Sequence, residues 1–516
     1  MNASAQPVGM QPVPLPEILG ELGAYELEAG RPEGVRVRSV TNDSREVEEG
    51  ALFVAVRGFA DDGRRFIAQA VERGAVAVLS EEFPGGIGTG GAVCIRVPDA
   101  RRALSLAAAS CYGHPARSLK VVGVTGTNGK TTTARLIASI LSMNGLPCGY
   151  VGTGKAIVGG REFPLERTTP EGHGLQRLLR MMVDAGSRAV VMEVSSHALE
   201  LGRVHGLAFD AAVFTNLTPD HLDFHPSMEA YAEAKRRLFD QLAPGGMGVF
   251  NVDDPKAAFM AARVPEDQRA CCSLEAHPFR GMRCGSSYGA LLAGESAGSS
   301  RVRLSFPGVA ELEAEYRLPG RFNVMNLLEA AAASHALGLS AEAIVSTVPA
   351  LQGVEGRMER VEGPAIRGTA IVDYAHTPDA LRQALSALRA LLPPDGRLVV
   401  VFGCGGNRDR LKRPEMGRIA AELADRVVIT SDNPRDEDPE AILDGIEAGM
   451  EKRGHLRITD RAEAIRAAVA MLRRQDVLLV AGKGHETYQE ARGRREHFSD
   501  REVLESGLNP KEETNA

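Results

Sequence analysis

Several features that would place this chain in a membrane or on a nucleic acid are missing from its sequence. No run of about 18 apolar residues exists, which excludes a transmembrane helix. Met1–Pro14 has neither a charged start nor an apolar stretch, so we expect no signal peptide, no membrane insertion and a cytoplasmic location. The 60 basic and 67 acidic residues give a net charge of −7 without a basic block, and we therefore expect no nucleic-acid partner.

Cysteines are few and scattered. The chain has seven, an odd number, and none forms a C-x-x-C pair. We therefore predict reduced thiols rather than a disulfide framework or a zinc site. Hydrophobic residues make up 44% and charged residues 25% of the 516 residues, which indicates a soluble globular protein of about three domains.

A phosphate-binding pattern lies at Val121–Thr133, V-V-G-V-T-G-T-N-G-K-T-T-T, and predicts a strand, a glycine-rich turn and a helix. Gly126 and Gly129 let backbone N–H groups approach phosphate oxygens. Lys130 supplies a positive charge, and the hydroxyl of Thr131 suits Mg²⁺. The first glycine stands at position 123 instead of 124, and a simple connecting turn is the alternative. Because Gly-Lys-Thr follows a strand and opens a helix, we predict that the chain binds a nucleoside triphosphate.

Apolar strands that end in polar residues recur along the rest of the chain, which predicts α/β domains with ligands at the carboxyl ends of the strands. We expect an N-terminal α/β domain at 1–116, a central phosphate-loop domain with a mostly parallel sheet at 117–351, and a C-terminal Rossmann-like, doubly wound domain at 352–516. Alternating apolar residues predict an edge hairpin within 302–318, whereas 274–300 show no readable pattern. The stretch G-C-G-G-N-R at 403–408 is not G-x-G-x-x-G, so a dinucleotide site is not favoured.

Three residues beyond the phosphate loop are candidates for metal chemistry. Glu193 and His221 follow predicted strands and would hold Mg²⁺ together with Thr131. The alternatives are an acid at a helix start for Glu193 and a turn cap for His221. Lys235 lies in an amphipathic helix, where the pattern alone predicts a solvated side chain.

Two further segments carry charged groups that suit ligands. In D-N-P-R, Arg435 would clamp a carboxylate and Asp432 would accept from an ammonium, as an amino acid requires, although a capped turn is equally compatible. Near the start, D-S-R at 43–45 and D-D-G-R-R at 61–65 suit either a phosphate-bearing ligand or a solvated turn.

Eleven motifs in order along the chain resemble those of the Mur ligase family, the ATP-dependent amide-forming enzymes that build the peptide stem of bacterial peptidoglycan. The resemblance runs from about Ser39 to Arg501, nearly the whole chain. The motifs are D-S-R (43–45), G-T-N-G-K-T-T (126–132), T-T-P (168–170), E-V-S-S-H (193–197), N-L-T-P-D-H-L-D (216–223), Y-A-E-A-K (231–235), G-R-F-N-V-M-N (320–326), G-R-M-E (356–359), D-Y-A-H-T-P-D-A-L (373–381), D-N-P-R (432–435) and G-K-G-H-E (482–486).

The resemblance implies a ligase of peptidoglycan synthesis that uses ATP and Mg²⁺. D-N-P-R is similar to the stretch in family members that add meso-2,6-diaminopimelate to UDP-N-acetylmuramoyl-L-alanyl-D-glutamate, and lysine-adding members depart from it at the arginine. The mechanism implied is phosphorylation of the D-glutamate side-chain carboxylate by ATP, followed by attack of the diaminopimelate amine on the acyl phosphate.

The resemblance also implies roles for individual residues. The catalytic set is Lys130, Lys235, Glu193 and His221, and the metal set is Thr131, Glu193, His221 and Lys235, the last as a carbamate. The ATP set is Gly126, Thr127, Asn128, Gly129, Lys130, Thr131, Thr132, Asn323, Asn326, Arg357, Asp373 and His376. The UDP-substrate set is Ser44, Thr168, Thr169, Ser195 and Arg203, and the diaminopimelate set is Arg408, Asp432, Asn433, Pro434, Arg435, Gly482 and Glu486.

Three alternatives stay open. They are a lysine-adding ligase of the same family, a folate or other polyglutamate ligase, and a nucleotide-switched binding protein. Arg435 argues against the first, D-N-P-R and D-S-R against the second, and a second substrate domain against the third. We expect a monomer whose C-terminal domain closes before chemistry.

Overall fold

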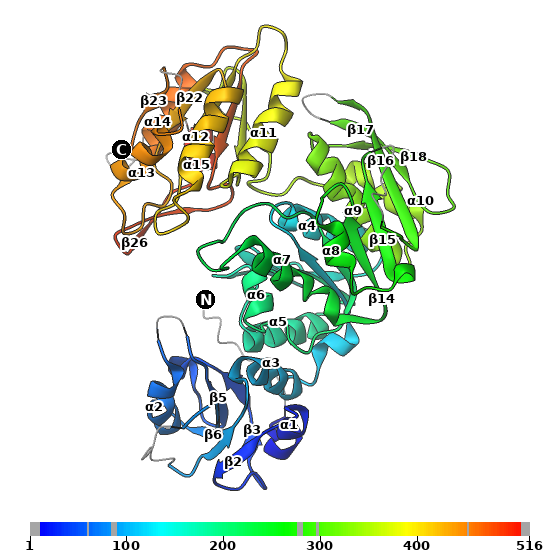
Figure 1. Ribbon diagram of the computed structural model, residues 1–516, viewed down its shortest axis with the longest axis vertical. Helices are drawn as coiled ribbons and strands as arrows, with labels where there is room; N and C mark the ends of the chain where they lie inside the picture. Colours follow the sequence, from blue (N-terminus) through cyan, green and yellow to red (C-terminus); the bar gives the residue numbers. More distant parts are fainter. Residues whose placement is uncertain are drawn as a thin grey trace.

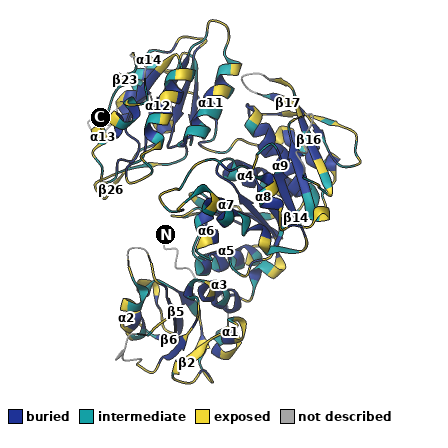
Figure 2. Ribbon diagram, viewed as in Figure 1, coloured by how far each residue is buried: buried dark blue, intermediate teal, exposed yellow. Residues whose placement is uncertain are grey.

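The computed structural model describes residues 11–58, 61–83, 90–275, 282–295, 299–450 and 454–506. Figure 1 shows three lobes that follow one another along the chain, from the blue N-terminal lobe through the cyan and green central lobe to the yellow and red C-terminal lobe. In Figure 2 the inner strands are mostly buried, and the exposed residues lie on the outer faces of the helices, in loops and on edge strands such as β2 (Glu26–Ala29). The chain is therefore α/β throughout, as predicted.

The N-terminal lobe has helices on both faces of a small sheet. Its elements are β1 (Val13–Pro14), α1 (Leu15–Glu21), β2 (Glu26–Ala29), β3 (Arg36–Val37), β4 (Ser39–Thr41), β5 (Ala51–Ala55), α2 (Ile67–Glu72), β6 (Ala75–Ser80), β7 (Val93–Arg96) and α3 (Ala100–Cys111). The sheet has the order β2-β7-β6-β5-β4 and is parallel except for β2. All five residues of β5 are buried, as expected of an inner parallel strand.

The central lobe contains the largest sheet. Its elements are β8 (Lys120–Thr125), α4 (Lys130–Met143), β9 (Cys148–Gly152), β10 (Lys155–Val158), β11 (Arg161–Pro164), α5 (Gly172–Asp184), β12 (Ala189–Glu193), α6 (Ser196–Glu200), β13 (Phe209–Phe214), α7 (Met228–Arg236), β14 (Leu242–Asn251), α8 (Ala257–Ala261), β15 (Arg269–Ser273), β16 (Ser286–Glu295), β17 (Ser300–Ser305), β18 (Leu312–Tyr316), α9 (Arg321–Ala336) and α10 (Ala341–Thr347).

In the described residues this sheet has eleven strands in the order β11-β10-β9-β12-β8-β13-β14-β15-β16-β17-β18. In this spatial order the neighbouring strands β9-β12-β8-β13-β14-β15-β16 are parallel. At the two edges, β10 and β11 on one side and β17 and β18 on the other form antiparallel pairs. The predicted edge hairpin is confirmed as β17 and β18. Helices α4, α9 and α10 cover one face, and α5 to α8 cover the other.

The C-terminal lobe is a doubly wound sheet, as predicted. Its elements are β19 (Glu359–Val361), β20 (Thr369–Asp373), α11 (Pro378–Leu391), β21 (Leu398–Phe402), α12 (Lys412–Leu423), β22 (Arg426–Ile429), α13 (Pro439–Glu447), β23 (Leu456–Arg457), α14 (Arg461–Ala470), β24 (Val477–Ala481), β25 (Tyr488–Ala491), β26 (Arg494–His497) and α15 (Asp500–Ser506). The strand order is β19-β20-β24-β21-β22-β23, and only β19 is antiparallel to its neighbour. Helices α11 to α13 cover one face, and α14 and α15 the other.

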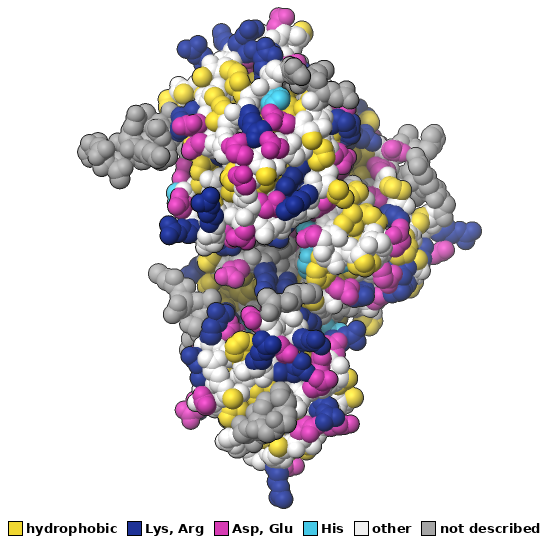
Figure 3. All heavy atoms as spheres, turned by 60° about the vertical axis from the view of Figure 1, so that its left-hand side comes forward, with side chains coloured by type: hydrophobic (Ala, Val, Ile, Leu, Met, Phe, Trp, Pro, Cys, Tyr) yellow, Lys and Arg dark blue, Asp and Glu magenta, His cyan; other side chains and the backbone are white. Residues whose placement is uncertain are grey.

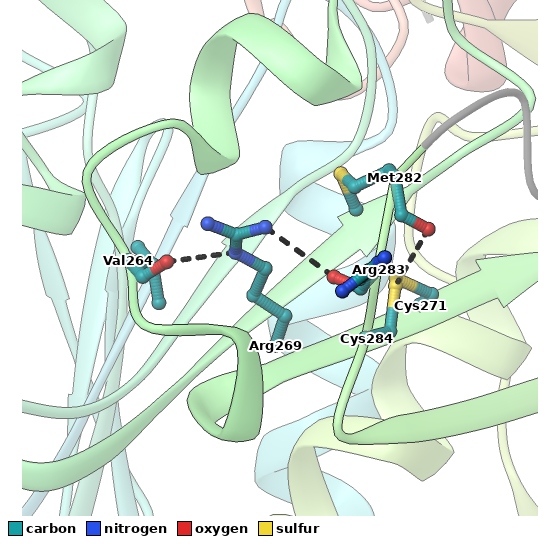
Figure 4. The surroundings of a disulfide bond; sticks show 6 residues. All are labelled: Val264, Arg269, Cys271, Met282, Arg283 and Cys284. Atoms are coloured by element: carbon teal, nitrogen blue, oxygen red, sulfur yellow. Dashed lines mark hydrogen bonds between the residues drawn. A yellow bond between two sulfur atoms is a disulfide. The ribbon is translucent and has the colours of Figure 1, made fainter.

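One cysteine pair departs from the predicted set of reduced thiols. Cys271 on β15 and Cys284, just before β16, form a disulfide, with Cα atoms 6.1 Å apart (Figure 4). Arg269 supports the turn beside it by donating to the backbone carbonyls of Val264 and Arg283. The spacing of the cysteines could not reveal this pair, because two adjacent strands of the sheet bring it together. The other five cysteines are free, as predicted.

The surface shows no segregation of charge on the face drawn in Figure 3. Lysine and arginine side chains are interspersed there with aspartate and glutamate, and the face is hollowed between the upper lobe and the rest. Among the described residues, no helix is both long enough and apolar enough to span a bilayer.

Candidate active site

A cavity of about 810 Å³ lies between the carboxyl ends of the central strands and the C-terminal lobe. Its wall includes the turn between β8 and α4, the residues that follow β12, β13 and β14, one side of α9, and the β20–α11 segment. Because parallel strands present their carboxyl ends at one edge, four of the polar strand ends seen in the sequence converge here. The cavity is therefore shared by two lobes.

The phosphate loop has room only for glycine at two positions. Gly126 has φ +150°, and a Cβ there would lie 1.9 Å from Oγ1 of Thr215. Gly129 has φ +83°, and a Cβ there would lie 2.5 Å from Oδ1 of Asn326. Thr215 Oγ1 also donates to the carbonyl of Asn128 at 2.6 Å. The residues after β13 thus pack closely against the loop.

Two lysines, the half-buried Lys130 and the buried Lys235, meet at this loop. Lys130 Nζ donates to the carbonyls of Gly126 and Thr127 at 3.1 and 2.8 Å, and Lys235 Nζ donates to the Gly126 carbonyl at 2.7 Å. Burial lowers the pKa of both ammonium groups, and for Lys235 the charge of Lys130 lowers it further. The solvated position that the helix pattern predicted for Lys235 is wrong, because the inner face of α7 packs on the loop and leaves this residue 1% exposed.

Glu193 is a fully buried carboxylate with four donors. One oxygen, Oε1, accepts from Tyr150 Oη at 2.7 Å and from the Thr153 backbone N–H at 2.9 Å. The other, Oε2, accepts from Thr131 Oγ1 at 2.9 Å and from Thr153 Oγ1 at 3.3 Å. Glu193 does not cap the following helix, since Ser195 does so by accepting from the backbone N–H of Ala198. Sequence reasoning missed Tyr150 and Thr153, because nothing in their own segment signals a ligand.

His221 accepts backbone hydrogen bonds in a turn, and its ring lines the cavity. Its φ of +55° places it in a tight turn, where its carbonyl accepts from the N–H groups of Phe224 and His225. Its ring lines the cavity and lies edge-on to that of His197, with centroids 4.9 Å apart. Desolvation lowers the pKa of His221, so the ring is neutral, the form that can bind a metal.

Within the described residues, no group of three or more His, Cys, Asp or Glu side chains is arranged to hold a metal ion. The expected metal set is instead chemically mixed. Thr131 and Glu193 offer oxygens 2.9 Å apart, and His221 offers a neutral ring nitrogen. Lys235 as an ammonium repels a cation and would join them only as an anion.

The residues expected at the nucleotide connect the two lobes. Arg357 Nη2 donates to Thr131 Oγ1 at 3.1 Å, and its guanidinium lies 4.4 Å from the ring centre of Tyr374. Asn128 Nδ2 donates to Asp379 on α11 at 2.9 Å. Sequence reasoning missed Asp379, which stands in the D-Y-A-H-T-P-D-A-L motif but was given no separate role.

The other expected nucleotide residues also lie on the cavity wall. Asn323 and Asn326 are buried on α9, and Asn326 Nδ2 donates to Asn323 Oδ1 at 3.2 Å. Asp373 accepts from the backbone N–H groups of Met358 and Ala375, and burial raises the pKa of its carboxyl. Burial lowers the pKa of His376 to about 4, which leaves its ring neutral.

Four of the five residues expected at the UDP-substrate are close together. Thr169 Oγ1 donates to the Glu193 carbonyl and accepts from the Ser195 N–H, while Arg203 donates to the Thr169 carbonyl at 3.1 Å. Thr168 pairs with Thr153 through their hydroxyls, 3.1 Å apart. The fifth, Ser44, belongs to the N-terminal lobe, where its hydroxyl donates to Gln69 at 2.8 Å.

The D-N-P-R and G-K-G-H-E motifs meet at the carboxyl ends of β22 and β24. Asn433 Nδ2 donates to Glu486 at 2.9 Å, and the fully buried Lys483 donates to Asn433 Oδ1 and to Glu486 at 3.0 and 3.2 Å. A Cβ at Gly482 would lie 2.7 Å from Asp432 Oδ2. Lys483 was missed as a separate candidate, although its motif was recognised.

Arg435 follows directly in this segment. It has φ +52°, and its Nη1 donates to the Gly406 carbonyl at 2.7 Å. Its Nε lies 3.8 Å from Glu490 on β25. A Cβ built at Gly405 would be 3.1 Å from Arg435 Nη1 and 3.8 Å from Arg408 Cγ, so both arginines flank the same glycine turn.

Comparisons with known proteins agree along the chain. The profile of the Mur ligase family catalytic domain matches residues 36–112, that of the Mur ligase middle domain residues 124–334, and that of the Mur ligase glutamate ligase domain residues 356–484. The UDP-N-acetylmuramoyl-L-alanyl-D-glutamate–2,6-diaminopimelate ligase of Chlorobaculum tepidum is 54% identical over 95% of this chain and 96% of its own. The ligase of the same name from Chlorobium phaeobacteroides is 52% identical over 96% of each.

Solved structures give the same result. A structure with that same ligase name has a TM-score of 0.65 at 34% identity and covers 96% of this chain and 99% of its own. A Mycobacterium tuberculosis folylpolyglutamate synthase shares the fold at 19% identity, with a TM-score of 0.56 over 73% of this chain and 91% of its own. With three matched domains and relatives above half identity over nearly its full length, the chain belongs to the Mur ligase family.

Proposed function

We propose that this chain is the ATP-dependent ligase that joins meso-2,6-diaminopimelate to the D-glutamate of UDP-N-acetylmuramoyl-L-alanyl-D-glutamate in peptidoglycan synthesis. One structural observation supports this proposal independently of the similarity to the relatives. Tyr374 lines the cavity of the phosphate loop, and its hydroxyl donates to Glu486 of the D-N-P-R site at 3.5 Å. A nucleotide site and an amino-acid site therefore adjoin, as amide formation at the expense of ATP requires.

The chemistry begins with the meeting of two anions. A D-glutamate carboxylate oxygen forms a bond to the γ-phosphorus while the bond to the β–γ bridging oxygen breaks, and ADP leaves. Buried cations must offset the charge that accumulates on the phosphoryl oxygens. Lys130 lies in the loop and Arg357 reaches Thr131 from the other lobe, and these positions support a role for both on those oxygens. The buried, backbone-held loop costs little reorganisation during the reaction.

The acyl phosphate then reacts with the amino acid. The neutral amine nitrogen forms a bond to the acyl carbon, the bond from that carbon to phosphate oxygen breaks, and the nitrogen loses a proton. Asp432 and Glu486, two carboxylates at the strand ends, would hold an ammonium centre, and the pKa of Glu486 is raised mainly by its burial. Arg435 and Arg408 flank the turn that would receive carboxylates. L-Lysine lacks the second carboxylate that this arginine pair suits.

The residues present also fit a Mg²⁺ ion. Thr131, Glu193 and neutral His221 would hold it together with Lys235 as a carbamate. When bound, the ion would withdraw negative charge from the phosphate oxygens. The carbamate is supported by the lowered pKa of Lys235, because only a neutral amine attacks CO₂. Carbamylation also converts a repelling cation into an anionic oxygen ligand.

We further propose one ligand for each lobe. Residues 1–116, with Ser44, would bind the UDP end of the substrate, whose remainder reaches Thr168, Thr169, Ser195 and Arg203. Residues 117–351 would bind ATP through the phosphate loop and the α9 asparagines, and 352–516 would bind diaminopimelate. We expect a cytoplasmic monomer, and light scattering at a mass near 55.0 kDa would support the monomer whereas twice that mass would contradict it.

Phosphate release tests the reaction directly. The reaction contains ATP, Mg²⁺ and UDP-N-acetylmuramoyl-L-alanyl-D-glutamate, with meso-diaminopimelate in one tube and L-lysine in another. Release with diaminopimelate alone is expected. Release with lysine alone would assign the chain to the lysine-adding members, and release with neither would favour a nucleotide-switched binding protein.

A further inference from the structure

Glu329 on α9 is a buried acid that the proposed reaction does not use. It is fully buried, it forms part of the wall of the nucleotide cavity, and its Oε2 accepts from Thr133 Oγ1 at 3.1 Å. Its other oxygen, Oε1, is buried with no hydrogen-bond partner among the described residues. A buried polar atom without a partner is costly, so such an atom on a ligand cavity points to a group of the ligand.

The charge state of Glu329 defines which group it would bind. Burial raises the pKa of its carboxyl well above the ordinary value, and the negative charges of Asp253 and Asp254 raise it further. The side chain is therefore a neutral acid. The Thr133 hydroxyl has one hydrogen and lies 3.1 Å from Glu329 Oε2 and 3.3 Å from Asn326 Oδ1. When that hydrogen is donated to the nearer Oε2, the proton of the acid resides on Oε1, which becomes a donor in need of an acceptor. Asp253 and Asp254 already accept from backbone N–H groups of Leu274 and Leu217.

The surroundings of Glu329 suit a flat aromatic ring. Asn326, one helical turn earlier on α9, lies over Gly129 of the phosphate loop. The wall of the same cavity includes apolar side chains from several elements, with Leu274 after β15, Leu292 on β16, Phe322 and Met325 on α9, and Ala387 on α11. Ligand sites of this kind combine apolar walls with a few placed polar groups.

We propose that Glu329 is a specificity-determining residue for the nucleotide base, donating from Oε1 to a ring nitrogen of the purine of ATP. The proposal rests on the ATP-dependent function proposed above. Adenine presents unprotonated ring nitrogens, which are acceptors, whereas N1 of guanine carries a hydrogen. N3 and N7 are acceptors in both bases, so the preference for adenine requires that Oε1 donates to N1, and the N1 analogue is the one expected to lose affinity.

Binding to the base is tested by a cycle that changes both the residue and the ligand. Kd is measured by calorimetry for ATP and for ATP analogues in which N1, N3 or N7 is replaced by C–H, using the full chain, Glu329→Gln and Glu329→Met. With the wild type, one analogue should bind about tenfold more weakly than ATP. In Glu329→Met, ATP and that analogue should bind equally well. Glu329→Gln keeps an N–H donor of similar shape and should restore most of the preference for ATP.

Two results would overturn the proposal. If Glu329→Met weakens ATP and all three analogues by the same factor, the residue only supports the packing of α9 on α4 through Thr133. If it lowers the melting temperature but leaves every Kd unchanged, the role is likewise structural. The proposed function is judged separately, because it fails only if the wild type binds no ATP or releases no phosphate with either amino acid.

Discussion

A substitution at Arg435 tests how the proposed site selects its amino acid. Arg435→Lys keeps the charge but removes the planar fork that suits a carboxylate. We expect KM for diaminopimelate to rise by about tenfold to a hundredfold, since a charged hydrogen bond is lost, while KM for ATP stays the same. Phosphate release at varied diaminopimelate measures both constants.

Arg495→Lys provides the matched control. Arg495 lies 3.5 Å from the same Glu490 carboxylate, but its side chain is 60% exposed, and among the described residues no hydrogen bond or ion pair joins it to the Gly406 turn. Its replacement should leave KM for diaminopimelate unchanged. Equal increases for both variants would mean that the hairpin, rather than the side chain of Arg435, determines affinity.

Lys235 allows a test of carbamylation at a single side chain. After exposure to ¹³C-bicarbonate, the wild type should show a carbamate signal by NMR, and Lys235→Arg should lose both that signal and phosphate release. Because burial lowers the pKa of Lys235, its neutral amine exists at lower pH than an exposed lysine allows, and the signal should disappear as acid protonates the amine. Lys120→Arg, a change on the surface, should retain signal and activity.

Among the elements, the turn between β8 and α4 tolerates little change at its glycines. Gly126→Ala would place a methyl group 1.9 Å from Thr215 Oγ1, so we expect ATP affinity to fall at least about a hundredfold. Gly145, just after α4, has φ +78°, and a methyl group added there would have no atom within 4 Å. Gly145→Ala should therefore cost about 1–2 kcal/mol of unfolding free energy without changing the Kd for ATP.

The phosphate loop and its surroundings illustrate which features could be predicted from the sequence alone. The phosphate loop, the polar strand ends and the edge hairpin were all predicted, because each has a local pattern of glycines, apolar runs or alternation. Three of the four donors around Glu193 were not, since they belong to Tyr150 and Thr153, which reach it from β9 and the turn that follows. The helix pattern gave the wrong environment for Lys235, because periodicity describes a helix and not the loop packed against it.

Burial that depends on distant segments escaped prediction for the same reason. The Cys271–Cys284 bond needs β15 and the start of β16 side by side, and 274–300 offered no pattern from which to infer that strand. Glu329 sits in an alanine- and leucine-rich helix whose pattern is that of ordinary core. Only the position of α9 against α4 and the cavity makes its carboxyl unusual.

For the whole molecule, we predict that the C-terminal lobe changes position during the reaction cycle. Only two side-chain hydrogen bonds described above, Asn128 to Asp379 and Arg357 to Thr131, tie that lobe to the phosphate loop. Binding of ATP and the UDP-substrate should add contacts across the cavity and reduce the radius of gyration. Small-angle scattering with and without both ligands measures the change, and superimposable curves would contradict closure.

Arg357 links the position of the C-terminal lobe to the phosphate loop. It precedes the C-terminal sheet in the chain, yet its guanidinium reaches a threonine of the ATP site. The lobe that we propose to bind the amino acid would thus also bring a positive charge to the place proposed for phosphate transfer. Displacing that lobe would withdraw the arginine, so a molecule not ready to form the amide would also be slow to split ATP. On this proposal, the position of the C-terminal lobe would itself restrain ATP hydrolysis that is not coupled to amide formation.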